Sequence, residues 1–160
     1  MDKTNVMRIL DQKKIPYTPY EYSADTTDGE SIARILSKDP NRTFKTLVTV
    51  ANTGVHFVFV VPVNQNLDLK KAAKAVGVKS IAMIKQKELL PLTGYIHGGC
   101  SPIGMKKAFA TVIHESALQF ETICFSAGRV GRQVELDPRK LLELIRATAA
   151  DLCEPKEAAT

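Results

Sequence analysis

The chain has 160 residues, of which 44% are hydrophobic and 24% charged, a composition typical of one globular domain rather than a disordered chain. Its 22 Lys and Arg residues outnumber 17 Asp and Glu residues, so the formal net charge is +5. No apolar run approaches the roughly 18 residues that cross a bilayer, and the N-terminus lacks the apolar stretch of a signal peptide. Three cysteines without CxxC spacing argue against a disulfide framework and a zinc ribbon. We therefore expect a cytoplasmic protein with free thiols, no membrane association, no metal and no cofactor.

The positive charge is concentrated in one part of the chain. Residues 67–110 contain eight lysines and two acidic residues, so this segment carries +6 and the rest of the chain sums to −1. A local basic zone favours a polyanionic partner, with nucleic acid first. A solvated lysine-rich helix face would give the same count, so charge alone leaves both interpretations open.

The first third of the chain predicts two short helices with an extended segment between them. Apolar residues at helical spacing predict helices over Thr4–Lys13 and Ser31–Leu36. Pro16 and Pro19 favour an extended backbone over Tyr17–Tyr22.

The clearest hairpin follows. Phe44–Ala51 and Val55–Val63 are rich in β-branched and apolar residues, and Asn52-Thr53-Gly54 lies between them as a turn. Because Val58–Val63 is apolar throughout, we expect the second strand to be covered on both faces.

The second half of the chain is predicted to contain short helices and strands in alternation. The expected helices are Asp68–Val76, ended by Gly77, Gln86–Leu92, interrupted or ended around Pro91, and one opened by Asp137-Pro138. The expected strands are Ser80–Ile84, Tyr95–His97, Thr111–His114, Thr122–Ala127 and Gln133–Leu136. Strands that come as hairpin-like neighbours favour an α+β fold over a doubly wound one. We expect a single domain over residues 1–153, with a curled, mostly antiparallel mixed sheet of barrel-like shape surrounded by helices, and a polar tail over 154–160.

Several familiar kinds of catalytic site do not fit the sequence. No histidine stands at i, i+4 from another His or Cys, so no metal site is expected, and only His97 abuts a glycine loop. Ser101 lacks the G-x-S-x-G setting of a nucleophile elbow and is followed by Pro102. The Gly99–Gly104 spacing misplaces the lysine of a P-loop and lacks its Ser or Thr. Nothing near Cys100 favours a thiolate, so we expect an inert thiol there.

Two glycine loops and one lysine remain as candidates. Residues 98–104 and 128–131 contain glycines that would let the backbone approach a ligand closely, although they could equally serve only to make turns. Lys45 opens an apolar strand, and alternation points it away from the side of Phe44 and Thr46. Such a lysine either ends the sheet at the surface or reaches into a pocket.

Four linked segments resemble the YbaK/EbsC family, from about residue 4 to residue 152. They are FKTLV at 44–48, LDLKKAAK at 67–74, TGY at 93–95 and GGCSPIG at 98–104. The resemblance implies a mixed fold with a curled sheet and the hydrolysis of mischarged aminoacyl-tRNA, above all Cys-tRNA(Pro), in which the substrate thiol cleaves its own ester. A deacylase for another small amino acid such as alanine, and a non-catalytic module that binds tRNA or a synthetase, stay open as alternatives. The implied partners are the acceptor end of a mischarged tRNA and, as a further alternative, prolyl-tRNA synthetase.

The resemblance also implies site residues. The implied catalytic residues are Lys45, Gly98, Gly99, Ser101 and Pro102. The implied substrate-binding residues are Tyr20, Thr46, Cys100, Ile103, Gly104, Ser126, Gly128 and Asp137. The implied nucleic-acid-binding residues are Lys70, Lys71, Lys74, Lys106 and Lys107.

Asp137 is equally the N-cap of the last helix. Two departures from the family pattern, Asp28 before Gly29-Glu30 and Ala127 between Ser126 and Gly128, leave the amino-acid selectivity open.

Overall fold

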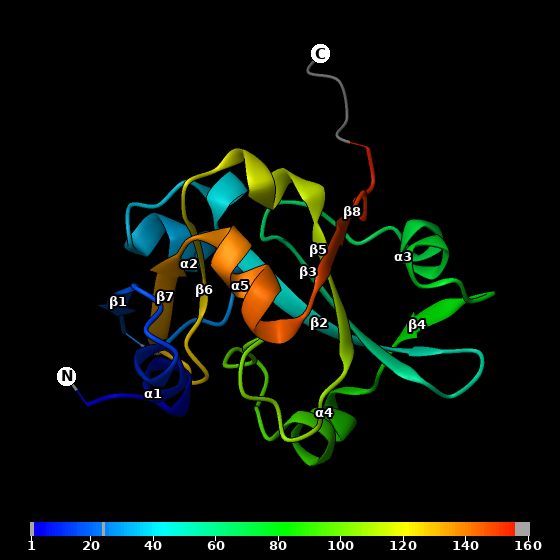
Figure 1. Cartoon of the computed structure of the whole chain (residues 1–160), viewed down its shortest axis with the longest axis horizontal. Coiled ribbons are helices and arrows are strands. Elements are labelled where there is room, and N and C mark those ends of the chain that lie inside the picture. Colours follow the sequence, from blue (N-terminus) through cyan, green and yellow to red (C-terminus); the bar gives the residue numbers. More distant parts are fainter. Residues whose placement is uncertain (1, 24, 156–160) are drawn as a thin grey trace.

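Strands from both halves of the chain form two sheets in the computed structural model, which describes residues 2–23 and 25–155 (Figure 1). The three-stranded sheet is antiparallel and consists, in spatial order, of β1 (Thr18–Glu21), β7 (Arg132–Leu136) and β6 (Ile123–Ser126). The five-stranded sheet consists, in spatial order, of β4 (Ile81–Met83), β2 (Phe44–Ala51), β3 (His56–Pro62), β5 (Ala110–His114) and β8 (Thr148–Ala150). In it β2 pairs antiparallel with β3 and β4, whereas β3, β5 and β8 run parallel.

The α+β class, the hairpin and the mostly antiparallel pairing are confirmed, but the barrel-like curl is wrong. Neither sheet is closed or strongly curled. Their strands touch through one isolated bridge between Thr43 and Cys124. The short helix η1 (Pro40–Arg42) directly precedes Thr43, so the backbone before the bridge is not extended. The predicted domain boundary at residue 153 stays a prediction, and residues 156–160 of the predicted tail lie outside the described residues.

Five α-helices in the described residues cover the sheets. They are α1 (Asn5–Gln12), α2 (Gly29–Ile35), α3 (Leu69–Val76), α4 (Gln86–Thr93) and α5 (Pro138–Ile145). Each except α4 begins behind a side chain that accepts a hydrogen bond from a first-turn N–H, namely Thr4, Asp28, Asp68 and Asp137 in chain order. A short 3-10 helix, η2 (Glu115–Gln119), follows β5. None of the helices in this described part is long and apolar enough to cross a membrane.

Two predictions about individual elements fail. Tyr95–His97 is not a strand, because its backbone passes directly into a turn and the Tyr95 hydroxyl donates to the Ile103 carbonyl at 2.5 Å instead of lying along a sheet. Helix α4 continues through Pro91 to Thr93, since a proline near a helix end removes only one backbone hydrogen bond.

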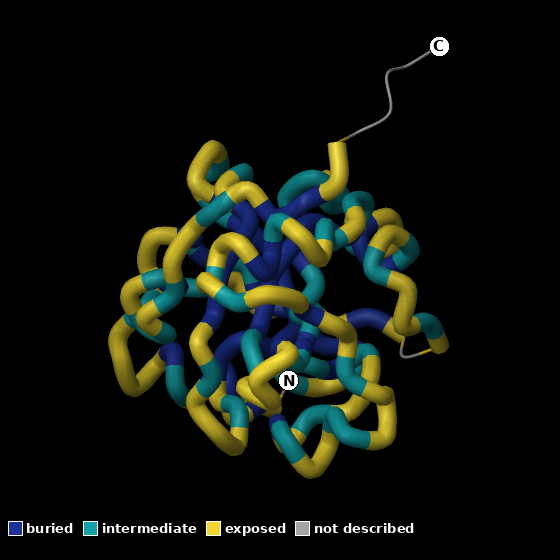
Figure 2. The backbone as a smooth tube through the Cα atoms, turned by 90° about the vertical axis from the view of Figure 1, so that its right-hand side faces the viewer, coloured by how far each residue is buried: buried dark blue, intermediate teal, exposed yellow. Residues whose placement is uncertain are grey.

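The core lies on both sides of β3, as the apolar run predicted. Val58 and Val60 belong to the large cluster shared with α1, α5 and the three-stranded sheet. Phe59 and Val61 belong to a second cluster under α3. Figure 2 shows these buried segments gathered at the centre, with exposed turns around them.

Candidate functional site

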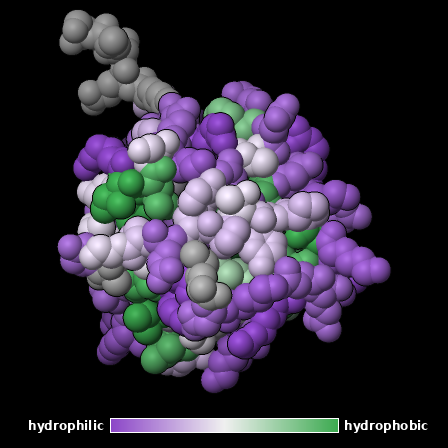
Figure 3. All heavy atoms as spheres, turned by 90° about the vertical axis from the view of Figure 1, so that its left-hand side faces the viewer, coloured by the Kyte–Doolittle hydropathy of each residue, from purple (hydrophilic) through white to green (hydrophobic). Residues whose placement is uncertain are grey.

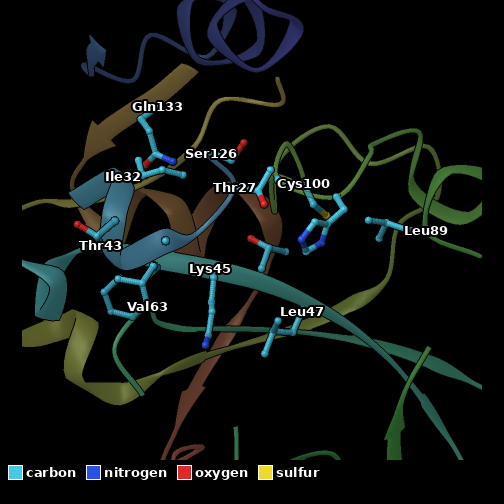
Figure 4. Close-up of a pocket in the computed structure, with 15 residues that line it drawn as sticks. Thr27, Ile32, Thr43, Lys45, Leu47, Val63, Leu89, Cys100, Ser126 and Gln133 are labelled. Atoms are coloured by element: carbon cyan, nitrogen blue, oxygen red, sulfur yellow. The ribbon is translucent and has the colours of Figure 1, made fainter. Parts of the chain in front are cut away.

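The candidate site is a cavity of about 180 Å³ beside the edge of β2 (Figure 4). β4 pairs with β2 only at Thr49–Ala51, so the earlier part of β2 has no such neighbour on that side. Its Phe44–Leu47 segment lines the cavity, together with the loop around Gly98 and the ends of β6 and β7. The volume exceeds the roughly 150 Å³ that accommodates a benzene molecule, so a small amino-acid side chain fits. An edge strand also leaves backbone groups free for a ligand.

Five residues predicted from the sequence line this cavity together: Lys45, Thr46, Gly98, Cys100 and Ser126. They come from β2, from the glycine loop and from the end of β6, which are far apart in the chain. Figure 4 shows Lys45 extending from β2, with Cys100 and Ser126 contributed by the other two segments. The structure therefore assembles the centre of the predicted site.

The other predicted catalytic and substrate-binding residues do not line it: Tyr20, Gly99, Ser101, Pro102, Ile103, Gly104, Gly128 and Asp137. Asp137 accepts a hydrogen bond from the Arg139 N–H at 2.9 Å, so the N-cap alternative is the one the structure supports. The Tyr20 hydroxyl donates to Glu135 at 2.6 Å. Buried Ser101 accepts from the Ile103 N–H at 3.3 Å and so braces the loop from beneath.

Lys45 is half-buried in the cavity wall. It lies opposite Val61 in the hairpin register, on the sheet face away from Phe44, as strand alternation predicted. Burial lowers the pKa of its amine, and the electrostatic effects of Cys153, Glu30 and Asp28 only partly oppose this effect. Among the described residues, no side chain forms an ion pair or hydrogen bond with Lys45. A cation left without a partner in a cavity is suited to an anionic or strongly dipolar ligand group.

Two buried polar atoms in the cavity-lining residues also have no hydrogen-bond partner among the described residues. They are Oε1 of Gln133, a residue only 5% exposed, and Oγ1 of Thr46. A buried oxygen without a partner is unfavourable, so both atoms are suited to accept hydrogen bonds from a ligand. Sequence reasoning missed Gln133, although its place opposite Ser126 in the β6–β7 register follows once the pairing is known.

Several apolar and polar wall residues were also missed: Thr27, Ile32, Leu47, Val63 and Leu89. Apart from Leu47, which lies in the FKTLV segment, no local motif marks them, because they come together only when α2 and α4 pack near β2.

Cys100 is the cysteine that lines the cavity. Burial raises the pKa of Cys100 to about 12, and a hydrogen bond with Thr93 opposes this only in part. A thiol that stays protonated is a poor nucleophile. The expectation of an inert Cys100 therefore has a physical basis in burial. Within residues 2–23 and 25–155, no three His, Cys, Asp or Glu side chains are grouped to hold a metal ion.

The predicted nucleic-acid-binding lysines lie outside the cavity. Lys70 and Lys74 are exposed on α3, whereas Lys71 donates to Asp151 and to the Cys153 carbonyl, both at 2.8 Å. Lys106 and Lys107 are exposed in the segment that follows the glycine loop. The face around β1 and α2 is mostly hydrophilic, with separate hydrophobic patches (Figure 3).

The α+β fold thus surrounds a small cavity with a lysine and with amide and hydroxyl oxygens that have no partner among the described residues, an arrangement suited to a small polar group. Comparisons with known proteins identify the family of this chain. The family model for the aminoacyl-tRNA editing domain matches residues 23–144. The chain therefore belongs to the aminoacyl-tRNA editing domain family, and the predicted resemblance to YbaK/EbsC proteins is confirmed.

Individual relatives agree with this assignment. A protein of Enterococcus faecalis named "Putative Cys-tRNA(Pro)/Cys-tRNA(Cys) deacylase EbsC" is 49% identical over 152 residues, which are 94% of this chain and 93% of the relative. The crystal structure of "a putative trans-editing enzyme for prolyl tRNA synthetase" has a TM-score of 0.82 and 25% identity, covering 96% of this chain and 100% of that one. The hypothetical protein APE2540 has a TM-score of 0.87 at 22% identity, covering 94% of this chain and 100% of that one, and shows the fold alone.

Proposed function

We propose that this protein is a trans-editing aminoacyl-tRNA deacylase of the cytoplasm, which hydrolyses the ester of Cys-tRNA(Pro). The observation that carries the proposal is the half-buried, unpaired Lys45 in a cavity large enough for a small aminoacyl group. The family assignment and the name of the Enterococcus faecalis relative support the reaction and the substrate.

The cavity wall offers groups for each part of the substrate. Lys45 binds the terminal ribose and phosphate region, where a cation is needed. The unpaired oxygens of Gln133 and Thr46 accept hydrogen bonds from the aminoacyl ammonium. Shape and hydrogen bonding thus hold the reacting ester in place, and positioning supplies much of the rate for an ester that is already activated.

The backbone of the glycine loop stabilises the oxyanion. The Gly99 N–H already donates to the Ile96 carbonyl at 3.0 Å, so it is not available. The N–H groups of Gly98 and Cys100 have no partner among the described residues, and both residues line the cavity. We assign oxyanion binding to these two donors. Gly99, Ser101 and Pro102 then act by holding the loop, since they lie behind the cavity wall.

A panel of tRNA substrates tests the proposal. Cys-tRNA(Pro) should lose its amino acid at least about 10-fold faster than Ala-tRNA(Pro) or Ser-tRNA(Pro), because only the cysteinyl group carries a nucleophilic thiol. Faster release of alanine would favour the alternative substrate, and binding without release of any amino acid would favour a non-catalytic module. Addition of prolyl-tRNA synthetase to the same assay tests whether a partner supplies tRNA selectivity.

The exposed lysines near the loop should bind the tRNA backbone. The double variant Lys106→Ala/Lys107→Ala should weaken tRNA binding and reduce the slope of log affinity against log salt concentration by roughly 1.4 to 1.8, since two phosphate contacts are lost. Filter binding over a range of salt concentrations measures this slope.

A matched control removes two exposed lysines elsewhere. Lys13→Ala/Lys140→Ala changes the net charge equally, at two exposed positions that do not line the cavity. This control should leave the slope unchanged. Equal effects of the two double variants would mean that net charge, and not a local interface, determines affinity.

A further inference from the structure

His97 is a histidine at the cavity wall with no role in the mechanism proposed above. It is exposed and lines the same cavity as Lys45 and Cys100. Among the described residues, no hydrogen bond or ion pair involves its side chain. An imidazole with both nitrogens free at the wall of a substrate cavity can exchange a proton with a bound ligand.

A tight turn fixes the position of His97. The Gly99 N–H donates to the Ile96 carbonyl at 3.0 Å, which closes a four-residue turn with His97 in its second position. Gly98, in the third position, has φ +87°, the left-handed backbone that a type II turn requires.

The turn is closely packed on both sides. A Cβ atom added to Gly98 would lie 2.9 Å from Cβ of Thr27, and one added to Gly99 would lie 3.0 Å from the backbone nitrogen of Val130. The turn therefore touches the α2 side of the cavity and the β6–β7 turn at once. Although His97 is exposed, its backbone cannot move away from the cavity without loss of these contacts.

The proposed reaction needs a base that removes the proton of the substrate thiol. A cysteinyl thiol attacks its own ester carbonyl only after it loses its proton. The titratable side chains that line the cavity are Lys45, His97 and Cys100, and near Lys45 the facing charges are Asp28 and Glu30 on the α2 side. Lys45 is needed as a cation, and the buried Cys100 thiol stays protonated. Of these three cavity-lining side chains, the imidazole is the one left to accept the proton.

We infer that His97 is the general base for the thiol of the bound cysteinyl group, an inference that rests on the proposed deacylase function. The thiol proton moves to the imidazole, and the thiolate sulfur forms a bond to the ester carbonyl carbon. The bond from that carbon to the ribose oxygen breaks, and the oxygen takes the proton back from the imidazolium. The products are free tRNA and a cysteine thiolactone, which water then hydrolyses to cysteine.

His97→Ala should lower the single-turnover rate of Cys-tRNA(Pro) deacylation by about 100-fold or more, because general base catalysis contributes at least that much. Imidazole added to the buffer should restore part of this rate in proportion to its concentration. The affinity for tRNA and the midpoint of thermal unfolding should not change, since the His97 side chain is exposed and unpaired. His97→Gln should behave like His97→Ala, because an amide cannot accept the proton.

Ile96→Ala is the matched control, since Ile96 is 56% exposed and occupies the first position of the same turn outside the cavity lining. It should keep the wild-type rate. A His97→Ala rate within two-fold of wild type would overturn the inference while the proposed function stands. An equal loss on Ala-tRNA(Pro) would also overturn it, because the base would then act on water. A wild-type protein that releases no cysteine would overturn the proposed function and this inference together.

Discussion

Lys45→Ala should reduce the release of cysteine from Cys-tRNA(Pro) by at least about 100-fold, the usual effect of removing one electrostatic group from a preorganised site. The amine is half-buried and has no protein partner among the described residues, so its binding energy is available to the substrate. Lys45→Arg keeps the positive charge but should release cysteine more slowly than wild type, because a planar guanidinium is wider than an ammonium and fits the cavity less well. Single-turnover deacylation with labelled cysteine measures both variants.

Cys100→Ala is the control for this prediction, because Cys100 lines the same cavity and its thiol stays protonated. It should retain most of the activity. If Cys100→Ala lost activity and Lys45→Ala kept it, the roles of the two residues would be reversed.

The same burial predicts an opposite effect of Lys45 on stability. Because the folded protein lowers the pKa of the amine, the protonated form disfavours folding at neutral pH, and this penalty declines as the pH rises toward the unfolded value of 10.5. Removal of the charge by Lys45→Met should therefore keep or raise the free energy of unfolding while activity is lost. Such a combination is typical of a residue retained for function rather than for folding.

Local signals in the sequence predicted most elements because each carries its own physical marker. Thr4, Asp68 and Asp137 precede apolar periodic segments, and each caps the helix expected from it. The hairpin follows from its β-branched strands and its glycine turn. β8 has no such marker, since Thr148–Ala150 is a three-residue edge strand that depends on pairing with β5.

The site could be predicted in part for the same reason. Lys45, Thr46, Gly98, Cys100 and Ser126 belong to motifs that resemble a family, and they meet in one cavity. Other wall residues depend on which face of a strand points inward, and register decides this only after β6 and β7 have paired. Other predicted residues, such as Tyr20 and Asp137, form hydrogen bonds with protein groups close to them and do not line the cavity.

Tyr20 belongs to a cluster of polar side chains around Glu135, whose loss should have a large effect on stability. Its hydroxyl and the Lys38 amine bind Oε1 of Glu135 at 2.6 and 3.1 Å. Arg42 and Thr122 bind the other carboxylate oxygen at 2.7 and 2.5 Å. The Glu135 side chain is only 11% exposed, so this cluster fastens the segment before β2 to β7.

Glu135→Ala should lower the free energy of unfolding by about 3 kcal/mol, because two cations would remain partly buried without their counter-charge. Denaturant titration measures this loss. Asp11→Ala, which breaks the exposed pair with Lys3 at 2.5 Å, should change the free energy of unfolding much less, because an exposed ion pair contributes little. Similar losses in both variants would mean that the Glu135 cluster stabilises the fold no more than an exposed ion pair does.

The pH dependence gives an independent test of the same cluster. Burial by itself would raise the pKa of Glu135, but hydrogen bonds from Thr122, Tyr20 and Lys38 outweigh it and lower the pKa to about 2. A carboxyl whose folded pKa is below its unfolded value of 4.5 stabilises the fold above that value. This contribution is lost as the pH falls from about 4.5 to about 2. Glu135→Gln should therefore be less stable than wild type at pH 7, and the difference should shrink in acid. A difference that stays constant with pH would show that the carboxylate charge does not stabilise the fold.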